Sequence, residues 1–470
     1  MNNIPFVKLF KTPMGYFFYD VNKNDIIKIN ECLYEYLEKI VAELPVLDNS
    51  TIDQTIGQLK QLGYLSPIHP SKIYNRSCEY IEDYINNCQE NVLLQITQDC
   101  NFRCRYCAFS GDGILEREHQ HKSMNLDIAK HAVDFVLKRS KYSEHINIGF
   151  YGGEPLIKFD LIKEIVEYVR ESAPNKDFLF GMTTNGYLLR DQILEYLIEN
   201  EFELLLSLDG PEPIHNKNRK LASNGKGTYN VVYDNLKNIY YNHPKYIGKI
   251  QINAVMDPET SYYETYDFFQ NDEVLKNFNV TLSNLDDSRL DMSYYYNDDN
   301  IEVIESKKLR QVLKNSGILA DKNNVRSYVD KGAEEFDKTL HDKAPISNIY
   351  HHNGPCMAGY MKLFIDINGN LWPCEKACDH SESMKIGNIF DGYDMDKINK
   401  MMNIGQLTAE ECKNCWAMRF CGICAVYADN FECYSKEMKL RYCKQIKDDT
   451  LESLKKYATM ESIKKELCNG

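Results

Sequence analysis

The chain has 470 residues, of which 43% are hydrophobic and 26% charged, an ordinary composition for a folded protein of two or three domains. A formal net charge of −14 argues against a nucleic-acid backbone as the main partner. No run of 18 or more apolar residues predicts a membrane span, and no secretory signal opens the sequence. We therefore expect a cytoplasmic protein with neither a nucleic-acid nor a membrane partner.

The cysteines are unusually numerous, at 16, and most of them lie in two groups, at 100–107 and 356–443. In a reducing compartment, clustered cysteines serve metal binding or catalysis more often than disulfide formation. The scattered cysteines are predicted to be packing or surface thiols; they are Cys32, Cys78, Cys88 and Cys468.

Residues 1–88 predict a small separate domain. Apolar stretches at 6–10 and 16–20 flank a Thr-Pro-Met-Gly turn, which is typical of a hairpin. Helices are expected at about 27–42 and 51–62. This order resembles the winged-helix domain that recognises precursor peptides in many peptide-modifying enzymes, which implies binding of a leader peptide at a sheet edge. A purely structural domain and a DNA-binding winged helix are the alternatives.

The central part of the chain alternates strand-like and helix-like segments. Alternation of this kind predicts an α/β fold with a parallel sheet and right-handed crossovers. Six units are too few to close an eight-stranded barrel, so we expect a partial (β/α)6 barrel over residues 89–285, open to a large substrate such as a peptide. The expected strands are 92–96, 146–151, 178–183, 203–207, 249–255 and 279–282, and the expected helices are 125–139, 159–171, 188–199, 230–240 and 262–271.

Cys100, Cys104 and Cys107 follow the first expected strand. The loop after such a strand lies at the carboxyl edge of the sheet, where α/β folds keep their chemistry. Three thiolates on one loop can bind three irons of a 4Fe–4S cluster and leave the fourth iron open to a small molecule. A structural zinc site needs a fourth ligand, and the nearest candidates, His119 and His121, are poorly spaced.

Glycine and polar residues gather at the ends of the next strands. A glycine pair lets a ligand approach the backbone closely, and a following carboxylate can accept from an ammonium group. Each position alone could be a turn or cap residue, but their joint placement indicates one ligand site. The positions are Gly152, Gly153, Glu154, Asn185, Ser207 and Asp209, with Arg219 shortly after.

The spacing of three and then two residues between the first cysteines, with Tyr106 before the last, resembles the signature of the radical S-adenosylmethionine (SAM) superfamily. The resemblance implies that Cys100, Cys104 and Cys107 hold a catalytic cluster whose open iron binds SAM. One electron then cleaves SAM to a 5′-deoxyadenosyl radical that abstracts a substrate hydrogen. It also implies SAM contacts for the strand-end residues Gly152, Gly153, Glu154, Asn185, Ser207, Asp209 and Arg219, with Tyr106 beside the adenine.

Residues 286–350 are polar and mixed, and they predict a bridging region without an assigned catalytic group. Helical patterns occur within it at 301–315 and 327–340.

The second cysteine group opens with Cys356, Gly369 and Cys374 and continues with two Cys-x2-Cys pairs. Paired zinc knuckles are one interpretation of such repeats. The spacing resembles the SPASM domain, an auxiliary-cluster module of radical SAM peptide maturases, over residues 351–445; it departs from that pattern by x2 in place of x3 before Cys424. Residues 446–470 predict a helical tail.

The SPASM resemblance implies two auxiliary 4Fe–4S clusters. Auxiliary cluster II would take Cys412, Cys415, Cys421 and Cys443, and auxiliary cluster I would take Cys356, Cys374 and Cys424. The fourth position of auxiliary cluster I is either Cys378 or an open iron that attracts a substrate thiolate. Cys433 is either a replacement for Cys443 or no ligand.

Taken whole, the chain resembles radical SAM/SPASM maturases, and most closely those that form thioether crosslinks in cysteine-rich precursor peptides of the sactipeptide, ranthipeptide and SCIFF types. The resemblance implies three 4Fe–4S clusters, SAM, a precursor peptide with a leader, and an electron donor such as flavodoxin or ferredoxin.

Two other peptide oxidations stay open. The first is the sulfatase-maturating reaction that produces formylglycine, in which an Asp after the second SPASM cysteine acts as base. Glu375 occupies that place here and is a candidate base. The second is carbon–carbon crosslinking. A non-catalytic cluster or zinc scaffold would require the SAM contacts to be accidental.

Overall fold

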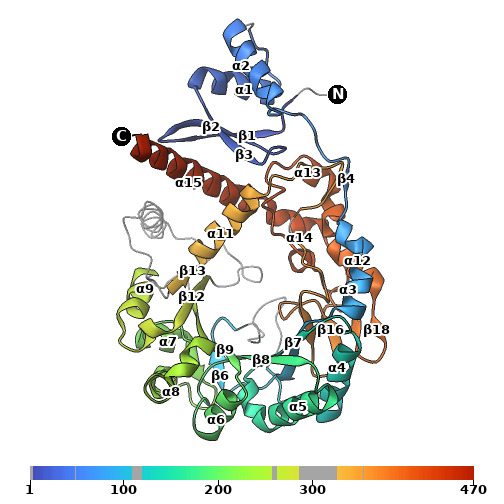
Figure 1. The fold of residues 1–470 in the computed structure, drawn as a ribbon, viewed down its shortest axis with the longest axis vertical. Coiled ribbons are helices and arrows are strands. Elements are labelled where there is room, and N and C mark those ends of the chain that lie inside the picture. Colours follow the sequence, from blue (N-terminus) through green and yellow to red (C-terminus); the bar gives the residue numbers. More distant parts are fainter. Residues whose placement is uncertain are drawn as a thin grey trace.

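The computed structural model describes residues 4–47, 49–107, 109, 119–256, 262–284, 325–352 and 354–469. A small N-terminal sheet with two helices stands at one end of the molecule, and a large curved sheet with its helices forms the other (Figure 1). Within the described residues, no helix combines the length and apolar character needed to cross a membrane.

The N-terminal sheet is antiparallel, with strand order β1-β2-β3. The expected hairpin is confirmed, but the first helix begins later than predicted, because residues 25–29 pair with β2 as a third strand. Asn30 then caps the helix, its side-chain oxygen accepting from the Leu33 amide at 2.9 Å. The elements are β1 (Val7–Thr12), β2 (Gly15–Asp20), β3 (Asp25–Ile29), α1 (Glu31–Val41) and α2 (Ser50–Gln61).

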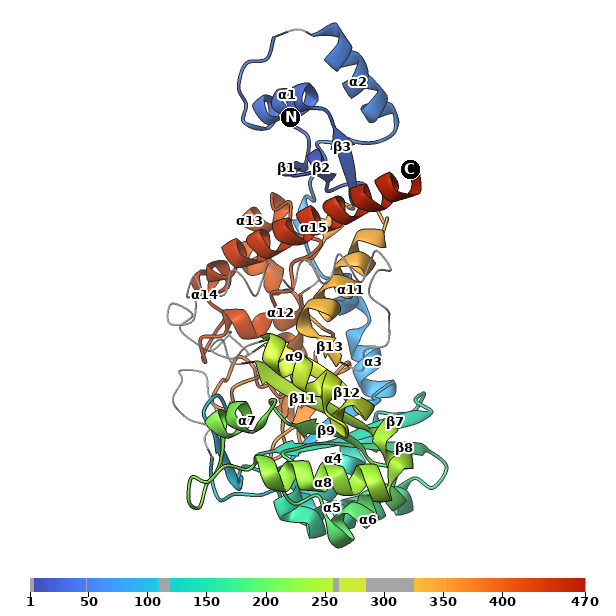
Figure 2. The ribbon, with the colours of Figure 1, turned by 90° about the vertical axis from the view of Figure 1, so that its left-hand side faces the viewer.

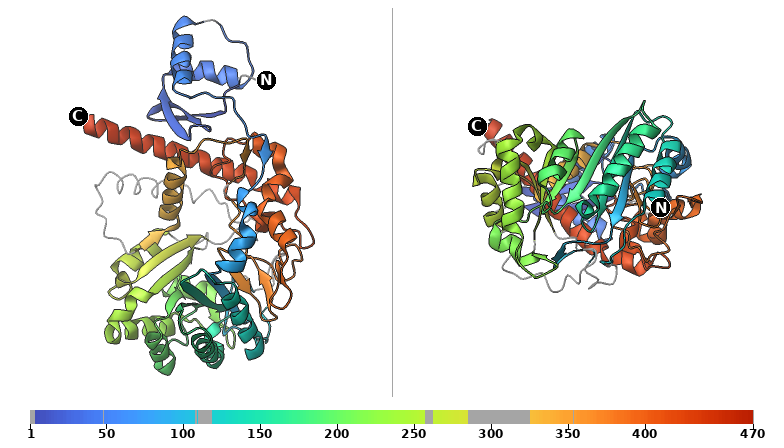
Figure 3. Two further views of the ribbon diagram at one scale, coloured as in Figure 1. Left: turned by 45° about the vertical axis from the view of Figure 1, so that its right-hand side comes forward. Right: turned by 90° about the horizontal axis from the view of Figure 1, so that it is seen from below.

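All six expected strands of the central region are present, parallel and adjacent in chain order. The partial barrel is therefore confirmed, with helices covering the outer face of its strands (Figure 3). The strands are β5 (Asn91–Thr97), β7 (His145–Gly152), β8 (Asp177–Thr184), β9 (Glu203–Ser207), β11 (Ile250–Met256) and β12 (Asn279–Asn284). The helices are α4 (Leu126–Lys138), α5 (Phe159–Ser172), α6 (Asp191–Glu199), α7 (Glu212–Asn218), α8 (Tyr229–Asn242) and α9 (Tyr262–Asn271).

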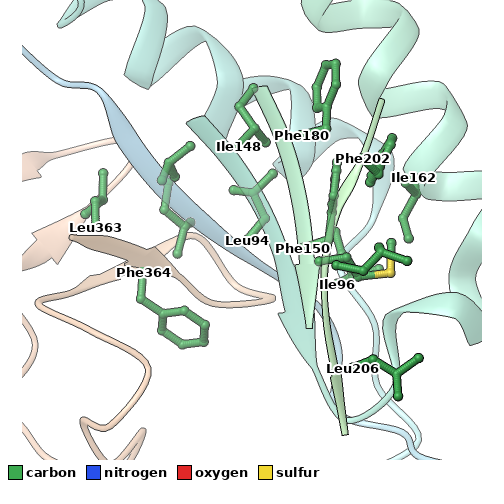
Figure 4. Close-up of a cluster of buried hydrophobic side chains, with 14 of the residues drawn as sticks. Leu94, Ile96, Ile148, Phe150, Ile162, Phe180, Phe202, Leu206, Leu363 and Phe364 are labelled. Carbon is green, nitrogen blue, oxygen red and sulfur yellow. The ribbon is translucent and has the colours of Figure 1, made fainter. Parts of the chain in front are cut away.

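Alternate residues of these strands build the main core. Phe150 stacks on Phe180 and Phe202 with ring centres 6.4 and 5.8 Å apart, and Leu94 and Ile96 lie in the same cluster (Figure 4). Burial of side chains of this size stabilises the fold by about 1.5–3 kcal/mol each. The core therefore fixes the strand ends from which the site residues extend.

The sheet is longer than predicted and is not parallel throughout. Leu363–Ile365 of β15 pair in parallel with β5, and antiparallel strands follow β15. At the other edge β13 pairs in parallel with β12, so the sheet has eleven strands within the described residues. The cause is the apolar run Leu363, Phe364 and Ile365, which is fully buried against the barrel edge (Figure 4). The added strands are β13 (Val325–Ser327), β15 (Leu363–Ile365), β16 (Asn370–Trp372), β17 (Gly387–Asn388) and β18 (Gly392–Tyr393).

The remaining elements connect the two ends of the molecule. Of the two helices expected in the bridging region, the second is confirmed as α11, and the first, at 301–315, lies outside the described residues. The long helix α15 passes beneath the N-terminal sheet (Figure 2). These elements are β4 (Lys72–Ile73), which pairs with β14 (Ile349–Tyr350), α3 (Ile81–Asn87), α11 (Tyr328–His341), α12 (Met395–Met402), α13 (Ala409–Lys413), α14 (Lys436–Arg441) and α15 (Cys443–Asn469). Two short strands, β6 (Phe102–Cys104) and β10 (Arg219–Leu221), form a separate pair.

The N-terminal sheet rests on the segment between Cys415 and Cys421. Arg419 in this segment is 2% exposed, and it donates from Nε to the Val21 carbonyl at 2.9 Å and from Nη2 to the Ala344 carbonyl at 2.8 Å. Phe420 packs on Tyr19 with ring centres 5.6 Å apart. One buried guanidinium thus joins the β2–β3 turn to the cysteine-rich region.

Replacing Arg419 by Met should loosen this junction. The carbonyls of Val21 and Ala344 lose a charged donor, and a buried group without its partner costs about 1–3 kcal/mol. Hydrogen–deuterium exchange should rise in β2 and β3 of the variant. Arg441→Met, at an exposed position of α14, is the matched control and should leave exchange there unchanged. Equal exchange in wild type and Arg419→Met would contradict the assigned role.

Candidate active site

The cysteine loop follows β5 and is held by β6. Cys104 in β6 lies opposite Arg219 in β10. Phe102, at the start of the same strand, is buried in the core. Burial raises the pKa of the Cys100 thiol, and the charges of Glu154, Cys104 and Cys107 raise it further. The three thiols therefore share one enclosed place, where their thiolate forms need a positive partner such as iron.

The glycine pair at the end of β7 lies directly against this loop. Gly152 has φ +137°, and a Cβ there would come within 2.1 Å of the Thr97 carbonyl oxygen. A Cβ on Gly153 would lie 2.1 Å from the Asp99 oxygen and 3.1 Å from Cβ of Cys100. The Gly153 amide donates to the Thr97 carbonyl at 2.9 Å. Only glycine permits this approach.

Glu154 is fully buried and joins the ends of β7 and β8. Its Oε1 accepts from Thr184 Oγ1 at 2.8 Å, and its Oε2 accepts from the Asn185 amide at 2.7 Å. Burial raises the pKa of the carboxyl to about 7, although these hydrogen bonds lower it. The carboxylate is thus already used by protein donors, and its role toward the SAM ammonium stays a prediction.

Asn185 faces the cysteine loop. Its Nδ2 donates to Asn101 Oδ1 at 2.7 Å and lies 4.0 Å from Cys100 Sγ. Ser207, at the end of β9, pairs in register with Asn253 of β11. The structure therefore brings Asn185 next to the first cysteine, and the ligand role of Ser207 stays a prediction.

Asp209 and Arg219 form a buried ion pair, which sequence reasoning missed because it treated them as separate ligand contacts. Arg219 donates from Nε to Oδ2 at 2.9 Å and from Nη2 to Oδ1 at 3.0 Å. Tyr106 OH donates to Oδ2 at 2.5 Å, and Arg219 Nη1 lies 4.0 Å from Cys104 Sγ. Burial lowers the pKa of Arg219, but Asp209, Tyr106 and Cys104 outweigh it, so that pKa lies well above its ordinary value. The pair fixes both Tyr106 and the cysteine loop.

His215 supports the same strand end from behind. Its Nδ1 accepts from the Asp209 amide at 3.3 Å, and its Nε2 lies 3.0 Å from Thr228 Oγ1. Burial lowers the pKa of His215 to about 3, so the ring is neutral at physiological pH. It is a structural partner of the loop that carries Asp209.

Cys356, Cys374 and Cys424 form a second set. Burial raises the pKa of Cys374 to about 12, and Glu375, Cys356 and Cys424 add to the rise. Both carboxylate oxygens of Glu375 accept a hydrogen bond from Lys362 Nζ, at 2.7 and 2.9 Å. Three thiols that are far apart in the sequence are thus gathered next to a paired carboxylate. Cys378 lies nearby in the chain and is 3% exposed.

Cys412, Cys415, Cys421 and Cys443 form a third set, on α13, the following loop and the first residue of α15. Burial raises the pKa of Cys421 to about 12, with further contributions from Cys415 and Cys412. Burial likewise raises the pKa of Cys443, with Cys412 as the next cause. Cys433 is exposed, and its carbonyl accepts from the Asn430 amide at 2.9 Å within a turn.

The chemistry of the donors decides which group the three sets could hold. Within the part of the chain that the structure describes, no three His, Cys, Asp or Glu side chains are spaced for one metal ion. Around a four-iron cluster, each thiolate binds a different iron, so the sulfurs stand farther apart than the ligands of a single ion. Half-buried, all-thiol sets of this kind fit iron–sulfur clusters, and Cys356 is the exposed member of the second set.

The barrel and its cysteine loop are similar to those of a known family. Residues 94–254 match the family description "Radical SAM superfamily". The solved structure of native anSMEcpe with bound AdoMet and Cp18Cys peptide superposes with a TM-score of 0.58 at 22% identity, over 80% of this chain and 98% of that one. At this identity the likeness establishes the fold, which is the partial barrel expected from the sequence.

Among curated proteins, an uncharacterised protein of Methanocaldococcus jannaschii is 31% identical over 33% of this chain and 50% of its own length. The radical SAM cyclopropyl synthase TigE of Paramaledivibacter caminithermalis is 25% identical over 60% of each chain. The cysteine-type anaerobic sulfatase-maturating enzyme of Clostridium novyi is 25% identical over 68% of this chain and 83% of its own. The chain thus spans 50% and 60% of the first two relatives.

Gly153→Ala should displace the cysteine loop, because its Cβ has no room beside Asp99 and Cys100. We expect the reconstituted variant to lose about four irons per chain and to stop cleaving SAM. Iron analysis and quantification of 5′-deoxyadenosine measure both. Gly248→Ala, where a Cβ would meet nothing within 4 Å, is the control. Full iron and full cleavage in Gly153→Ala would contradict the steric argument.

Arg219→Met should destabilise the whole chain, because it leaves the Asp209 carboxylate buried without its partner. Breaking a buried pair in this way costs about 3–5 kcal/mol, and thermal unfolding measures the loss. Lys249→Met breaks the exposed pair with Glu203, whose atoms are 3.2 Å apart, and should change stability by less than about 1 kcal/mol. Similar losses of stability in both variants would contradict the larger contribution expected from the buried Asp209–Arg219 pair.

Proposed function

We propose that this chain is a radical SAM enzyme that modifies a ribosomally made peptide, and that its reaction forms sulfur-to-carbon thioether crosslinks in a cysteine-rich precursor. Its relatives include a cyclopropyl synthase and sulfatase-maturating enzymes, and one of the matching solved structures contains a bound peptide. The observation that carries the proposal is the second set, in which the thiols of Cys356, Cys374 and Cys424 lie close enough together for Cys356 and Cys424 to raise the pKa of Cys374.

The three cysteine sets would hold three clusters. Cys100, Cys104 and Cys107 would hold the SAM-binding cluster, and the two later sets would hold the auxiliary clusters. When bound, SAM and the clusters would supply a 5′-deoxyadenosyl radical and accept a surplus electron. In the net reaction, the peptide would give one hydrogen atom to the 5′-deoxyadenosyl radical, which becomes 5′-deoxyadenosine. The thiol would lose one proton, and one electron would pass to an acceptor as the sulfur–carbon bond forms.

The chain's own residues would bind and orient SAM at the carboxyl ends of β7, β8 and β9. Gly152 and Gly153 would let the methionyl part approach the backbone, while Asn185, Ser207 and Arg219 would contact its polar groups. The hydrogen bond of Tyr106 to Asp209 would keep its ring in place beside the adenine.

The fourth position of the second set would decide the chemistry of the peptide sulfur. A substrate thiol that bound there would lose its proton, and its sulfur would be held near the radical. Cys378 is the protein's own candidate for the same position. Cys378→Ala separates the two cases: an unchanged cluster and unchanged crosslinking mean that the position is left for the substrate.

The N-terminal sheet would receive the leader peptide. β1 and β3 are the two edge strands of this sheet, each paired with β2 within the described residues, and β1 also contacts α15. The proposal takes the edge of β3 as the one that receives the added strand. Strand addition to such an edge is an established mode of peptide recognition.

A flavodoxin or ferredoxin would deliver the electron that cleaves SAM.

Anaerobic reaction with a cysteine-rich precursor should lower the peptide mass by two hydrogens per crosslink and remove one alkylatable thiol. Mass spectrometry before and after thiol alkylation measures both changes. Cys104→Ala, which removes a ligand of the SAM-binding cluster, should give no product. An unchanged peptide, with SAM cleavage intact, would reject thioether formation.

Formylglycine formation is the second candidate, because the sulfatase-maturating relative of Clostridium novyi matches over 83% of its length and because Glu375 lies beside the second set. Its carboxylate is paired with Lys362 and would have to leave that partner to act as a base. This reaction replaces sulfur by oxygen, so a hydrazide probe detects its aldehyde and a thioether product does not react. Carbon–carbon crosslinking would lower the mass by two hydrogens while leaving every thiol alkylatable.

A further inference from the structure

Lys439 is the charged residue that stands out in the cysteine-rich region. It lies on α14 with 1% of its surface exposed, one turn before Cys443. Its Nζ donates to Thr408 Oγ1 at 2.6 Å and lies 3.8 Å from Cys412 Sγ. Thr408 Oγ1 is itself 3.2 Å from the same sulfur. The ammonium group therefore points at the third cysteine set.

A buried lysine ordinarily has a carboxylate partner, because an isolated charge is costly to remove from water. Among the described residues, no ion pair joins Lys439 to an acidic side chain. The nearby His351 adds no charge of its own at physiological pH, because burial lowers its pKa to about 4 and leaves the ring neutral. The anionic groups close to the ammonium are the thiolate forms of the cysteines in this set and, farther toward the surface, the Glu411 carboxylate.

Each of the other two cysteine sets has a neighbouring cation that is paired with a carboxylate. Arg219, beside Cys104, is paired with Asp209 through two hydrogen bonds. Lys362, beside the second set, is paired with Glu375, and Lys376 also lies close to Cys424. At the third set, the buried Lys439 has no carboxylate at ion-pair distance among the described residues, and the nearest carboxylate whose charge it affects is the exposed Glu411.

We propose that Lys439 is a positioning residue that supplies a buried positive charge at the cluster of Cys412, Cys415, Cys421 and Cys443, and thereby raises its reduction potential above that of the same cluster without this charge. The inference rests on the proposed function, which places a 4Fe–4S cluster there. Four thiolates and an oxidised core carry a net charge of about −2, which becomes about −3 when one electron is added. A fixed cation nearby stabilises the more negative state, and an N–H donor to a cysteine sulfur acts in the same direction.

The consequence concerns an electron on the third set. Such an electron is more stable there than it would be without Lys439. The site lies next to the N-terminal sheet, since Arg419, between Cys415 and Cys421, donates to the Val21 carbonyl.

The test uses full-length chains in which the cysteines of the first two sets are alanine, so that one cluster can be reconstituted and titrated with dithionite and mediators. Iron content and the reduction potential, followed by electron paramagnetic resonance, are measured for Lys439→Met and Lys439→Arg. Lys439→Met should shift the potential to more negative values, and Lys439→Arg should retain it. Lys436→Met removes an exposed lysine of the same helix, paired with Glu411, and should leave the potential unchanged because water screens its charge.

A stability measurement separates the charge from a packing role. Without iron, Lys439→Met should unfold at the same or a higher temperature than its parent, because an unpaired buried cation is removed. With the cluster, it should unfold at a lower temperature. Loss of iron in Lys439→Met but not in Lys439→Arg would also support the proposal.

Two results would overturn it: the same potential and iron content in Lys439→Met as in the parent, or equal loss of iron in the Met and Arg variants. If the parent itself binds no iron at this set, the proposed cluster assignment fails, and that failure is visible before any lysine variant is compared.

Discussion

The structure depends on a contact between two backbone segments. The glycine pair at the end of β7 lies so close to Thr97 and Asp99 that no side chain fits between them. This contact fixes where the loop after β5 leaves the sheet, and hence where Cys100 stands. The Glu154 carboxylate then joins β7 to β8, and the Asp209–Arg219 pair joins β9 to β10 and the cysteine loop. Each successive strand end is thus positioned by its neighbour, starting from two glycines.

The periodicity of the sequence was sufficient to predict the six strands of the barrel, but it was not sufficient to predict β3 or β15. The six central strands are long and apolar, so their pattern identified them all. β3 was missed because Asn30, the helix cap that marks its end, was not used to separate it from α1. β15 was missed as a sheet strand because three apolar residues do not show which distant strand they pair with.

The site was predictable in its cysteines and less so in its polar residues. Spacing in the chain showed two groups of cysteines, and the resemblance to SPASM domains implied how the second group divides into two sets. In the folded chain, thiols of each predicted set lie near one another, and the cluster assignments stay predictions. The pairing of Asp209 with Arg219 could not be found in the same way, because both residue types also suit a ligand contact and only the fold brings them within 3 Å. Lys439 gave no signal at all, since a lysine in a helix with Glu437 beside it is typical of a solvated face.

The pairing of β15 with β5 has a consequence for how the chain can be divided. It makes the cysteine-rich region the lateral neighbour of the first barrel strand, so the two regions share one hydrogen-bonded surface. A shortened protein that ended before Leu363 would leave β5 with unsatisfied amides and carbonyls along one side. Strands left bare in this way readily pair with other chains, so self-association would be the expected fate of such a fragment.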